Sequence, residues 1–442
     1  MVRCQAARRF AMDDKSSQLI DVGQLRRGLF IQLDLGWMDH PFPRGSFKIT
    51  SSDQIRTIRA LGLTQVRYFP DRSDPEEPPS DFGAIPAIGE PRVADVAQDR
   101  LQAEARALQA QRHQQLAAQQ ASLQHCEQRF GEVVRLYQRV VEEVPARPVA
   151  MREQCEALVA RCVAEILVDG EATIRLLSEG SGESQATHPA NTMVLALLLG
   201  RAVGLPAHGL AELGIAALLH DLGKQQLPAQ LRMRDERYKP EEMAIYRSHV
   251  GESVKTGRRM GLSAWALQVI GQHHEMADGS GFPAGVQGED MSTGGKVLAL
   301  VNRYDRLCNP PVMAQALTPH EALALTFARH KACFDAEVLG AFIRMMGVYP
   351  PGSVVQLANE RFALVVSVNS TRPLKPRVLV HDPAVPPDQA LILDLESVPE
   401  QGIRRSLKPA QLPASARAYL APVSRVRCFY EHQPPARAPA AA

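Results

Sequence analysis

The sequence predicts a multidomain protein in which an all-α domain is flanked by a small α+β module and a small β-rich module. The chain has 442 residues, enough for about three domains at roughly 150 residues each. Helix caps recur along residues 150–347, whereas short β-branched runs occupy residues 18–72 and 350–432. Hydrophobic residues make up 45% and charged residues 22%, which excludes a wholly disordered or fibrous chain.

The N-terminal module is expected to be a compact α+β unit. The stretches "LRRGLFIQLD" and "LTQVRYF" carry short β-type runs. Between them a helix is expected to begin at Ser52, to carry apolar residues at helical spacing, and to end at Gly62. A proline- and acid-rich linker is predicted over residues 73–91.

A long helical segment is predicted over residues 92–148, because strong helix formers dominate it and Gly and Pro are almost absent. Apolar residues recur there every seven positions: Leu116, Leu123, Phe130, Tyr137 and Val144. This spacing fits a coiled-coil seam that would join two copies of the chain in a homodimer. It equally fits a helix that packs on its own domain, and the sequence leaves both interpretations open.

The central segment is predicted to be a succession of helices without a strand. His188 lies at the start of one helix, and another is expected to begin near Pro240 and to contain His249. Thr318 and Asp335 have the sequence context of N-caps for the last two helices.

The end of the chain is expected to form a small β-rich module over residues 350–432, because short β-branched runs alternate there with Asn, Ser and Pro. The last residues, 433–442, are rich in Pro and Ala and are predicted to be a disordered tail.

Composition and targeting signals favour a cytoplasmic protein. A formal net charge of +2 gives no bias toward a nucleic acid polymer or a membrane surface. The seven cysteines include no C-x-x-C pair, which fits a reducing compartment. The N-terminus lacks the apolar core of a signal peptide, and the apolar run at 193–200 is far shorter than the ~20 residues of a membrane span, so no membrane insertion is expected.

Histidines concentrate at the predicted helix ends of the central segment. Five of the thirteen histidines lie within 87 residues: His188, His220, His249, His273 and His274. The other eight are interpreted as ordinary core or surface residues. In "AALLHD", an imidazole and the carboxylate of Asp221 close an apolar helix, where burial would be costly without a compensating cation. A mixed histidine and carboxylate set suits iron, zinc or manganese rather than magnesium or calcium.

Such a ligand set points to hydrolysis of a phosphodiester. A carboxylate that bridges two metal ions, with imidazoles on each, lowers the pKa of a shared water until hydroxide exists at neutral pH. Two ions can also clamp the attacking and leaving oxygens of the reaction. Lys224, three residues after Asp221, offers a mobile positive charge for a phosphate oxygen.

These motifs resemble the HD-GYP family of phosphodiesterases, a branch of the HD superfamily of metal-dependent phosphohydrolases. "LLHDLGKQQLP" and "HHEMADGSGFPAG" occur in the order and at the separation typical of that family, within residues 150–347. The resemblance implies hydrolysis of the bacterial second messenger cyclic di-GMP to pGpG and/or GMP, with two divalent metal ions, iron or manganese being expected. It also implies protein partners in signalling. The N-terminal module resembles a domain of unknown function that often precedes HD-GYP domains.

The resemblance also assigns roles to individual residues. It implies this set of metal ligands: His188, His220, Asp221, His249, His273, His274 and Asn302. Asp221 would bridge the metals, and Lys224 would contact the substrate phosphate. The loop residues expected to bind substrate are Asp278, Gly281, Phe282 and Pro283, although Asp278 and the glycines could equally be turn formers.

Two further acids are expected to support the ligands from behind. Glu275 is interpreted as the acceptor that orients a ligand histidine, with solvation of the helix end as the alternative. Asp305 lies one helical turn after Asn302 and is placed in the same supporting group.

Four positions depart from the family pattern. Phe282 replaces the tyrosine of the Gly-Tyr-Pro tripeptide. In "VNRYDRLCNPP", Asn302 stands where the family has a ligand aspartate, and Pro311 stands where an arginine commonly contacts phosphate. Ser184 stands where family members with a third metal have glutamate, so two metals are expected.

The departures keep other functions open. A catalytically degenerate domain could act as a cyclic di-GMP receptor or as a protein-interaction module, because an amide oxygen is a weaker ligand than a carboxylate. An HD hydrolase for another nucleotide is a third interpretation, disfavoured by the Gly-Phe-Pro loop.

Overall fold

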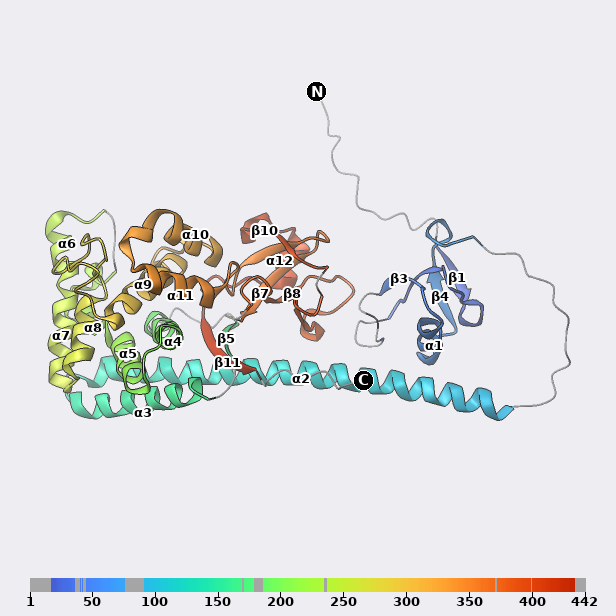
Figure 1. Ribbon diagram of the computed structural model, residues 1–442, viewed down its shortest axis with the longest axis horizontal. Coiled ribbons are helices and arrows are strands. Elements are labelled where there is room, and N and C mark those ends of the chain that lie inside the picture. The colour runs from blue at the N-terminus through green and yellow to red at the C-terminus, as the bar shows by residue number, and fades with distance from the viewer. Residues whose placement is uncertain are drawn as a thin grey trace, which may run out of the picture. The chain divides into compact units, whose positions relative to one another are not determined.

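The structure is a computed structural model that describes most of the chain. The described residues are 17–35, 40, 42, 45–75, 91–168, 171–178, 186–233, 237–369, 372–398 and 400–433. Most of the predicted linker, Ser184 and nearly all of the predicted tail lie outside them. The chain divides into two units, each of which is taken by itself (Figure 1). The first unit comprises Met1–Gln119 and Asp382–Leu391. The second unit comprises Gln120–His381 and Ile392–Ala442.

The first unit contains the predicted α+β module. Its antiparallel sheet has the strand order β1-β4-β2-β3. The strands are β1 (Gln18–Asp21), β2 (Phe30–Gln32), β3 (Ser46–Lys48) and β4 (Gln65–Tyr68). Helix α1 (Ser52–Ala60) begins where predicted, after a capping box between Ser51 and Gln54. The fully buried Ile58 packs this helix into the core of the module, and Gly62 follows in the left-handed conformation.

The long helical segment is two helices, α2 (Pro91–Glu143) and α3 (Pro148–Ile166). Phe130, Tyr137 and Val144 are buried in the core of the second unit. Helix α3 lies beside α2, and an ion pair of 2.7 Å joins Arg129 to Glu165 (Figure 1). The heptad positions in this part of α2 therefore pack on their own domain and are not exposed for a seam between two chains.

Eight helices carry or flank the predicted metal ligands. They are α4 (Thr187–Ala202), α5 (Ala207–Leu219), α6 (Pro240–Arg247), α7 (His249–Met260), α8 (Ala264–Gln272), α9 (Thr293–Cys308), α10 (Pro319–His330) and α11 (Ala336–Met346). Thr318 and Asp335 are N-caps, as predicted. The single helix expected from Pro240 through His249 is wrong, because Ser248 ends α6 and precedes α7, so His249 begins a new helix. None of the described helices combines the length and apolarity needed to cross a bilayer.

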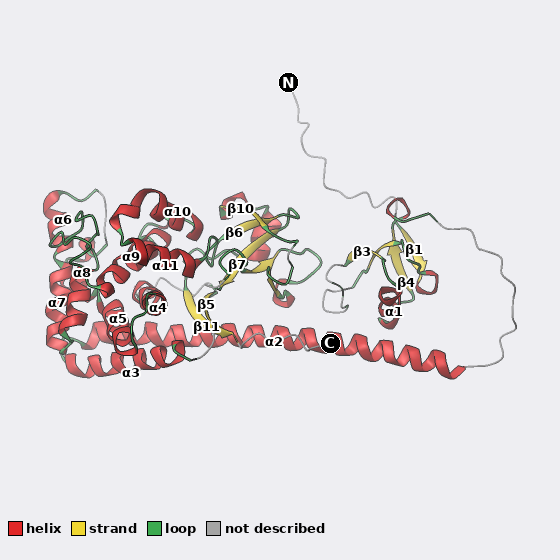
Figure 2. Cartoon of the chain, viewed as in Figure 1, coloured by secondary structure: helices red, strands yellow, loops and turns green. Residues whose placement is uncertain are grey.

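The C-terminal module is a sheet that also takes a strand from the central segment (Figure 2). It contains β5 (Glu171–Leu176), β6 (Val354–Leu357), β7 (Phe362–Val368), β8 (Arg377–Val380), β9 (Ile392–Asp394), β10 (Ile403–Leu407) and β11 (Cys428–Gln433), with α12 (Ala414–Leu420) beside them. The prediction that residues 150–347 are all-α is therefore wrong at β5. This strand pairs with β7 and β11, whose residues are far away in the sequence, so no local pattern reveals the pairing.

Buried polar contacts fasten this sheet to the helices. The carboxylate of Glu431 in β11 accepts a hydrogen bond of 2.9 Å from Ser122 in α2 and pairs with Arg175 at 3.4 Å. The backbone oxygen of Val426 accepts bonds of 2.8 Å from Asn191 in α4 and 2.9 Å from Asn309, the C-cap residue of α9. The C-terminal segment is thus anchored on the helices that carry the predicted metal ligands.

Candidate metal centre

Helix ends bring the predicted ligands to one point. His220 and Asp221 follow α5, His273 follows α8, and His249 is the first residue of α7. His188 lies in the first turn of α4. A helix terminus lets a side chain leave a buried apolar helix and face a shared space, which is why these polar residues occur at the boundaries of apolar segments.

The two carboxylate oxygens of Asp221 face different pairs of histidines. The Oδ2 atom lies 3.6 Å from Nε2 of His188 and 3.5 Å from Nε2 of His220. The Oδ1 atom lies 3.6 Å from Nε2 of His249 and 3.7 Å from Nε2 of His273. Asp221 is therefore placed as a bridge between two half-sites, each with its own pair of imidazoles.

The tautomers of these imidazoles are set by hydrogen bonds on the far side of each ring. The Nδ1 atoms of His220, His249 and His273 lie 2.8, 2.5 and 2.6 Å from the backbone carbonyl oxygen three residues earlier. Each Nδ1 must therefore donate, which leaves the lone pair on Nε2. Facing Nε2 atoms are 3.3 Å apart in both half-sites. Lone pairs that converge this closely on one carboxylate fit a bound cation.

Burial keeps these rings neutral. It lowers the pKa of His220, His249 and His273 to about 3, and it also lowers the pKa of His188. The rings are therefore not held around Asp221 as imidazolium ions at neutral pH. Neutral imidazole is the form that ligates a metal, so the protonation state agrees with the geometry.

Three of the predicted ligands each have a buried polar atom that makes no hydrogen bond within the described residues: Oδ1 of Asp221, Nε2 of His274 and Oδ1 of Asn302. Leaving such atoms unpaired is costly unless a ligand or ion satisfies them. His274 also belongs to the group with Asp221, His249 and His273 whose ligand atoms all lie within 4.8 Å of one another. The residues present therefore fit a divalent metal on each side of Asp221.

Asn302 is held by a hydrogen bond to the backbone of His273, one of the predicted ligands. Its Nδ2 donates to the backbone oxygen of His273 over 3.2 Å, which leaves Oδ1 as the free acceptor of a nearly fully buried amide. The oxygen can serve as a neutral ligand only. Its role as a ligand stays a prediction.

Asp305 supports His188 from behind. Its Oδ2 accepts from Nδ1 of His188 at 2.6 Å, and its Oδ1 accepts from Asn191 at 2.8 Å and from Asn309 at 2.9 Å. A carboxylate held in this way fixes the ring orientation and raises the basicity of Nε2. The geometry matches the supporting position expected for Asp305 and keeps it away from the place of a direct ligand.

Replacing Asp305 with asparagine is expected to weaken metal binding at the His188 half-site by about 10- to 100-fold, because the amide no longer supplies charge to the ring. Titration of the metal-free protein with manganese, followed by calorimetry, measures this affinity. Asp290→Asn, at an exposed carboxylate, is the control and should leave the affinity unchanged. An unchanged affinity in the Asp305 variant would contradict the supporting role.

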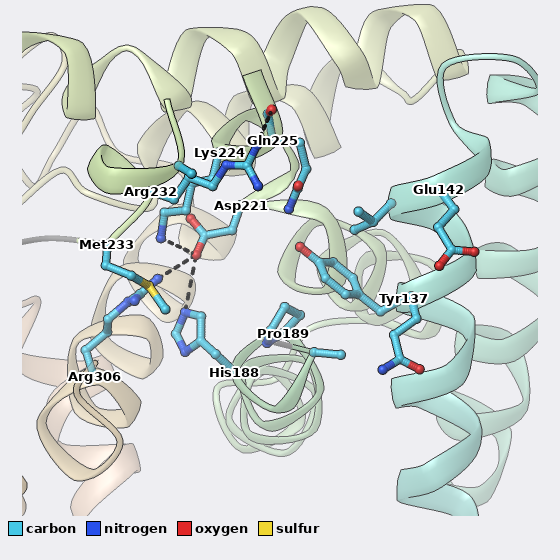
Figure 3. Close-up of a pocket in the computed structure, with 14 residues that line it drawn as sticks. Tyr137, Glu142, His188, Pro189, Asp221, Lys224, Gln225, Arg232, Met233 and Arg306 are labelled. Carbon is cyan, nitrogen blue, oxygen red and sulfur yellow. Dashed lines mark hydrogen bonds and ion pairs between the residues drawn. The ribbon is translucent and has the colours of Figure 1, made fainter. Parts of the chain in front are cut away.

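Two cations share one oxygen of Asp221. Nζ of Lys224 lies 2.5 Å and Nη2 of Arg306 lies 2.6 Å from Oδ2 (Figure 3). Burial alone would raise the pKa of Asp221, but Lys224, His220 and Arg306 together hold it well below its ordinary value. Burial and the charge of Arg306 lower the pKa of Lys224 to about 8. Lys224 is thus still mainly protonated at neutral pH.

Arg306 was not among the residues expected at the site. It lies four positions after Asn302 on α9, so the two side chains share one face of the helix. That spacing was the available signal.

A cavity of about 500 Å³ opens on the His188 side of Asp221, a size typical of small-molecule sites (Figure 3). Its lining includes three cations, Lys224, Arg232 and Arg306. Helix α2 supplies Tyr137, Gln138, Val141 and Glu142 to the same lining. The wall contributed by α2 was not expected from the sequence.

The Gly-Phe-Pro loop lies on the other side, against His274. The ring of Phe282 stacks on the His274 imidazole with centroids 4.4 Å apart. Asp278 is exposed and accepts from the backbone and hydroxyl of Ser280, as a turn former does. Neither these residues nor Gly281 and Pro283 line the cavity described above. Substrate binding by the loop stays a prediction.

Glu275 does not contact a histidine ring, so its expected role is corrected. Its carboxylate is buried and accepts hydrogen bonds of 2.8 Å from the amide of Ala284 and 3.0 Å from the amide of Val286. The backbone of the loop satisfies the carboxylate, which explains how a buried acid is tolerated there. Glu275 therefore fixes the loop that follows the two histidines.

Gly281→Ala is expected to destabilise the protein by about 1–3 kcal/mol, because an added Cβ would lie 2.6 Å from the backbone oxygen of His274 and 2.4 Å from the amide nitrogen of Met276. Urea unfolding of the metal-free protein measures the loss. Gly251→Ala is the matched control, since its Cβ meets nothing within 4 Å and alanine favours the helix. Equal stability of the two variants would refute the close contact.

Family comparisons agree with this architecture. The model of the HD domain matches residues 172–338, and the model of a domain of unknown function, DUF3391, matches residues 17–155. The HD-domain match contains the histidine–aspartate cluster, and the DUF3391 match contains the N-terminal module. Both matches agree with the resemblances expected from the motifs.

Several curated relatives are named as cyclic di-GMP phosphodiesterases. The chain is 28% identical over 373 residues to a cyclic di-GMP phosphodiesterase of Pseudomonas aeruginosa, a match that covers 82% of this chain and 84% of that protein. It is 24% identical to a cyclic di-GMP phosphodiesterase of Borreliella burgdorferi, over 43% of this chain and 50% of that one. A solved HDG"Y"P protein from Bdellovibrio bacteriovorus aligns with a TM-score of 0.42 and 15% identity, over 74% of this chain and 98% of that chain.

Proposed function

We propose that this protein is a metal-dependent phosphodiesterase that hydrolyses cyclic di-GMP to pGpG and/or GMP in the cytoplasm. The observation that carries the proposal is the placement of Asp221, whose two oxygens each face a separate pair of neutral imidazoles. The names of the relatives from Pseudomonas aeruginosa and Borreliella burgdorferi support the substrate. The described cysteines are all unpaired, which supports a reducing compartment.

The predicted ligands fall into two half-sites, which Asp221 joins. One half-site would hold a metal with His249, His273 and His274, and with Asn302 as a neutral ligand. The other half-site would hold a metal with His188 and His220, and Asp221 would join the two. When bound, divalent ions, expected to be iron or manganese from the donor set, supply the Lewis acidity that makes water a nucleophile at neutral pH.

Lys224 positions and neutralises the substrate in this proposal. Its ammonium group lies beside Asp221 in the wall of the cavity, where a phosphate oxygen of the substrate would approach. A buried cation in a region of low dielectric interacts with a phosphodiester more strongly than one in water. The network of Asp305 and Asn191 behind His188 keeps that ring oriented during the reaction.

The test is metal quantification combined with an assay under anaerobic conditions. We expect two equivalents of iron or manganese per chain, and conversion of cyclic di-GMP to pGpG or GMP detected by chromatography. A panel of other cyclic dinucleotides checks the substrate class. Metal-loaded protein that converts neither cyclic di-GMP nor pGpG would overturn the proposal.

A receptor function is the second candidate, and Asn302 favours it. A neutral amide in the buried ligand set binds a metal less strongly than a carboxylate would. A receptor would bind cyclic di-GMP with one metal equivalent or none and would release no product. The same experiment therefore separates the two functions.

Association with other chains is a separate proposal. Residues 103–119 of α2 are largely exposed, whereas the later heptad positions are buried. A homodimer formed through the heptad positions of α2 would therefore use residues 103–119. Sedimentation equilibrium with Leu116→Glu measures this, and the variant should be monomeric if the proposal is right.

A further inference from the structure

Tyr137 of α2 presents a hydroxyl group to the reaction cavity. Its side chain is buried, with 5% of its surface exposed, and its ring packs in the core of the second unit. The hydroxyl points toward the Asp221 side of the cavity (Figure 3). No residue in the described parts of the chain forms a hydrogen bond with it. The hydroxyl opens to the cavity, so it is available to form a hydrogen bond with a ligand there.

The charges around this hydroxyl favour an anionic ligand. Three cations line the cavity together with two carboxylates, those of Asp221 and the exposed Glu142. Lys224 and Arg306 both contact the same Oδ2 atom of Asp221, so one carboxylate oxygen offsets two positive charges. The Nε atom of Arg306 is also buried without a partner in the described structure.

Arg232, unlike Arg306, has a hydrogen-bond partner for its Nε atom. Its Nε and Nη2 atoms donate to backbone oxygens of Leu227 and Gln225, over 3.1 and 3.2 Å, so its guanidinium mainly holds the loop after Lys224. Arg306 has an Nε donor without a partner, and the hydroxyl of Tyr137 has no partner among the described residues. Together with Lys224, these two groups are available to recognise a bound molecule.

We propose that Tyr137 and Arg306 form a contact site for a phosphodiester anion beside the metal centre, with both side chains donating hydrogen bonds to its non-bridging oxygens. This inference rests on the proposed function for the identity of the natural ligand. The hydroxyl is a donor at neutral pH, because burial raises the pKa of Tyr137. A guanidinium is the side chain best suited to phosphate oxygens, since its donors are fixed in a plane.

The contact site joins two segments of the sequence that the family comparisons separate. Tyr137 lies within the match to the domain of unknown function, whereas Arg306 lies within the match to the HD domain. The HD segment alone therefore lacks one of the two donors. Helix α2 becomes a part of the substrate site and not only a connection between modules.

Binding of inorganic phosphate and turnover of cyclic di-GMP test the site together. Calorimetry with manganese-loaded protein gives the dissociation constant for phosphate, and steady-state kinetics give KM and kcat for cyclic di-GMP. We expect Tyr137→Phe to weaken phosphate binding and to raise KM by about tenfold, as for loss of a hydrogen bond to a charged group. Arg306→Lys should weaken phosphate binding by a similar factor, since it retains the charge and loses the planar donors.

Tyr430→Phe is the matched control. It removes a hydroxyl that donates to Glu165 in the domain core, away from the cavity, so it should change neither constant. Metal content and the urea midpoint of each variant show whether fold and metal sites are intact. If Tyr137→Phe binds phosphate like the wild type while its metal content is normal, the contact site is refuted.

The outcomes also separate this inference from the proposed function. Weakened phosphate binding in the Tyr137 and Arg306 variants of a protein that does not hydrolyse cyclic di-GMP supports the anion site and overturns the proposed function. Normal hydrolysis with unchanged KM and phosphate affinity in Tyr137→Phe supports the proposed function and overturns the contact site.

Discussion

Asp221→Asn is expected to lower the turnover of cyclic di-GMP by roughly 10³-fold or more and to reduce the bound metal to less than one equivalent. The substitution removes the negative charge that both half-sites share, and several kcal/mol of transition-state stabilisation are lost with it. It also leaves Lys224 and Arg306 as buried cations without their carboxylate partner. Metal analysis and the cyclic di-GMP assay on the same preparation measure both effects.

The control for this prediction is again Asp290→Asn, which makes the same chemical change at an exposed position. It should keep wild-type metal content and turnover. Two equivalents of metal in the Asp221 variant would show that the carboxylate is not the bridge. If the Asp221 variant keeps its full metal content but loses turnover, Asp221 acts in the chemical step and is not needed for metal binding.

Asn302→Asp is expected to have opposite effects on the metal-free and metal-loaded protein. Without metal, the new carboxylate would face the backbone oxygen of His273 that Asn302 now donates to. An unpaired buried charge of this kind costs roughly 3–5 kcal/mol in the free energy of unfolding. With metal, the carboxylate is an anionic ligand, and we expect metal affinity to rise by at least tenfold.

Urea unfolding with and without a chelator, together with a manganese titration, measures both parts of that prediction. Asn359→Asp is the control, since it adds the same charge in a turn of the C-terminal sheet and should not change metal affinity. Increased turnover in Asn302→Asp would show that the amide limits catalysis. Unchanged metal affinity would mean that position 302 is not a ligand.

Local sequence signals were sufficient for most of the helices and for the clustering of the histidines with Asp221. Caps such as Thr318 and Asp335 satisfy the first amides of a helix through neighbouring residues, so they can be recognised without a fold. The histidines were recognisable because polar groups that close apolar helices need a partner. The structure places His188, His220, Asp221, His249 and His273 around one centre.

Long-range contacts were beyond the reach of those signals. Strand β5 forms only because β7 and β11 lie beside it, and its six residues carry no distinctive local pattern. Tyr137 was classed as an apolar heptad residue, because the seven-residue spacing indicates that its ring is buried. The spacing does not indicate the direction in which the hydroxyl points. Glu275 was assigned to a histidine, whereas its partners are backbone amides that no side-chain pattern can show.

The hydrogen bonds around Val426 affect the order in which the metal centre can form during synthesis. Asn191 connects the backbone oxygen of Val426 to Asp305, and Asp305 holds His188. The amide of Val426 also donates to Asn309. The ligands themselves are all made by residue 302, yet the support behind His188 is complete only when residue 426 has left the ribosome. A nascent chain stopped before that point would carry every ligand and still lack a fixed His188 half-site.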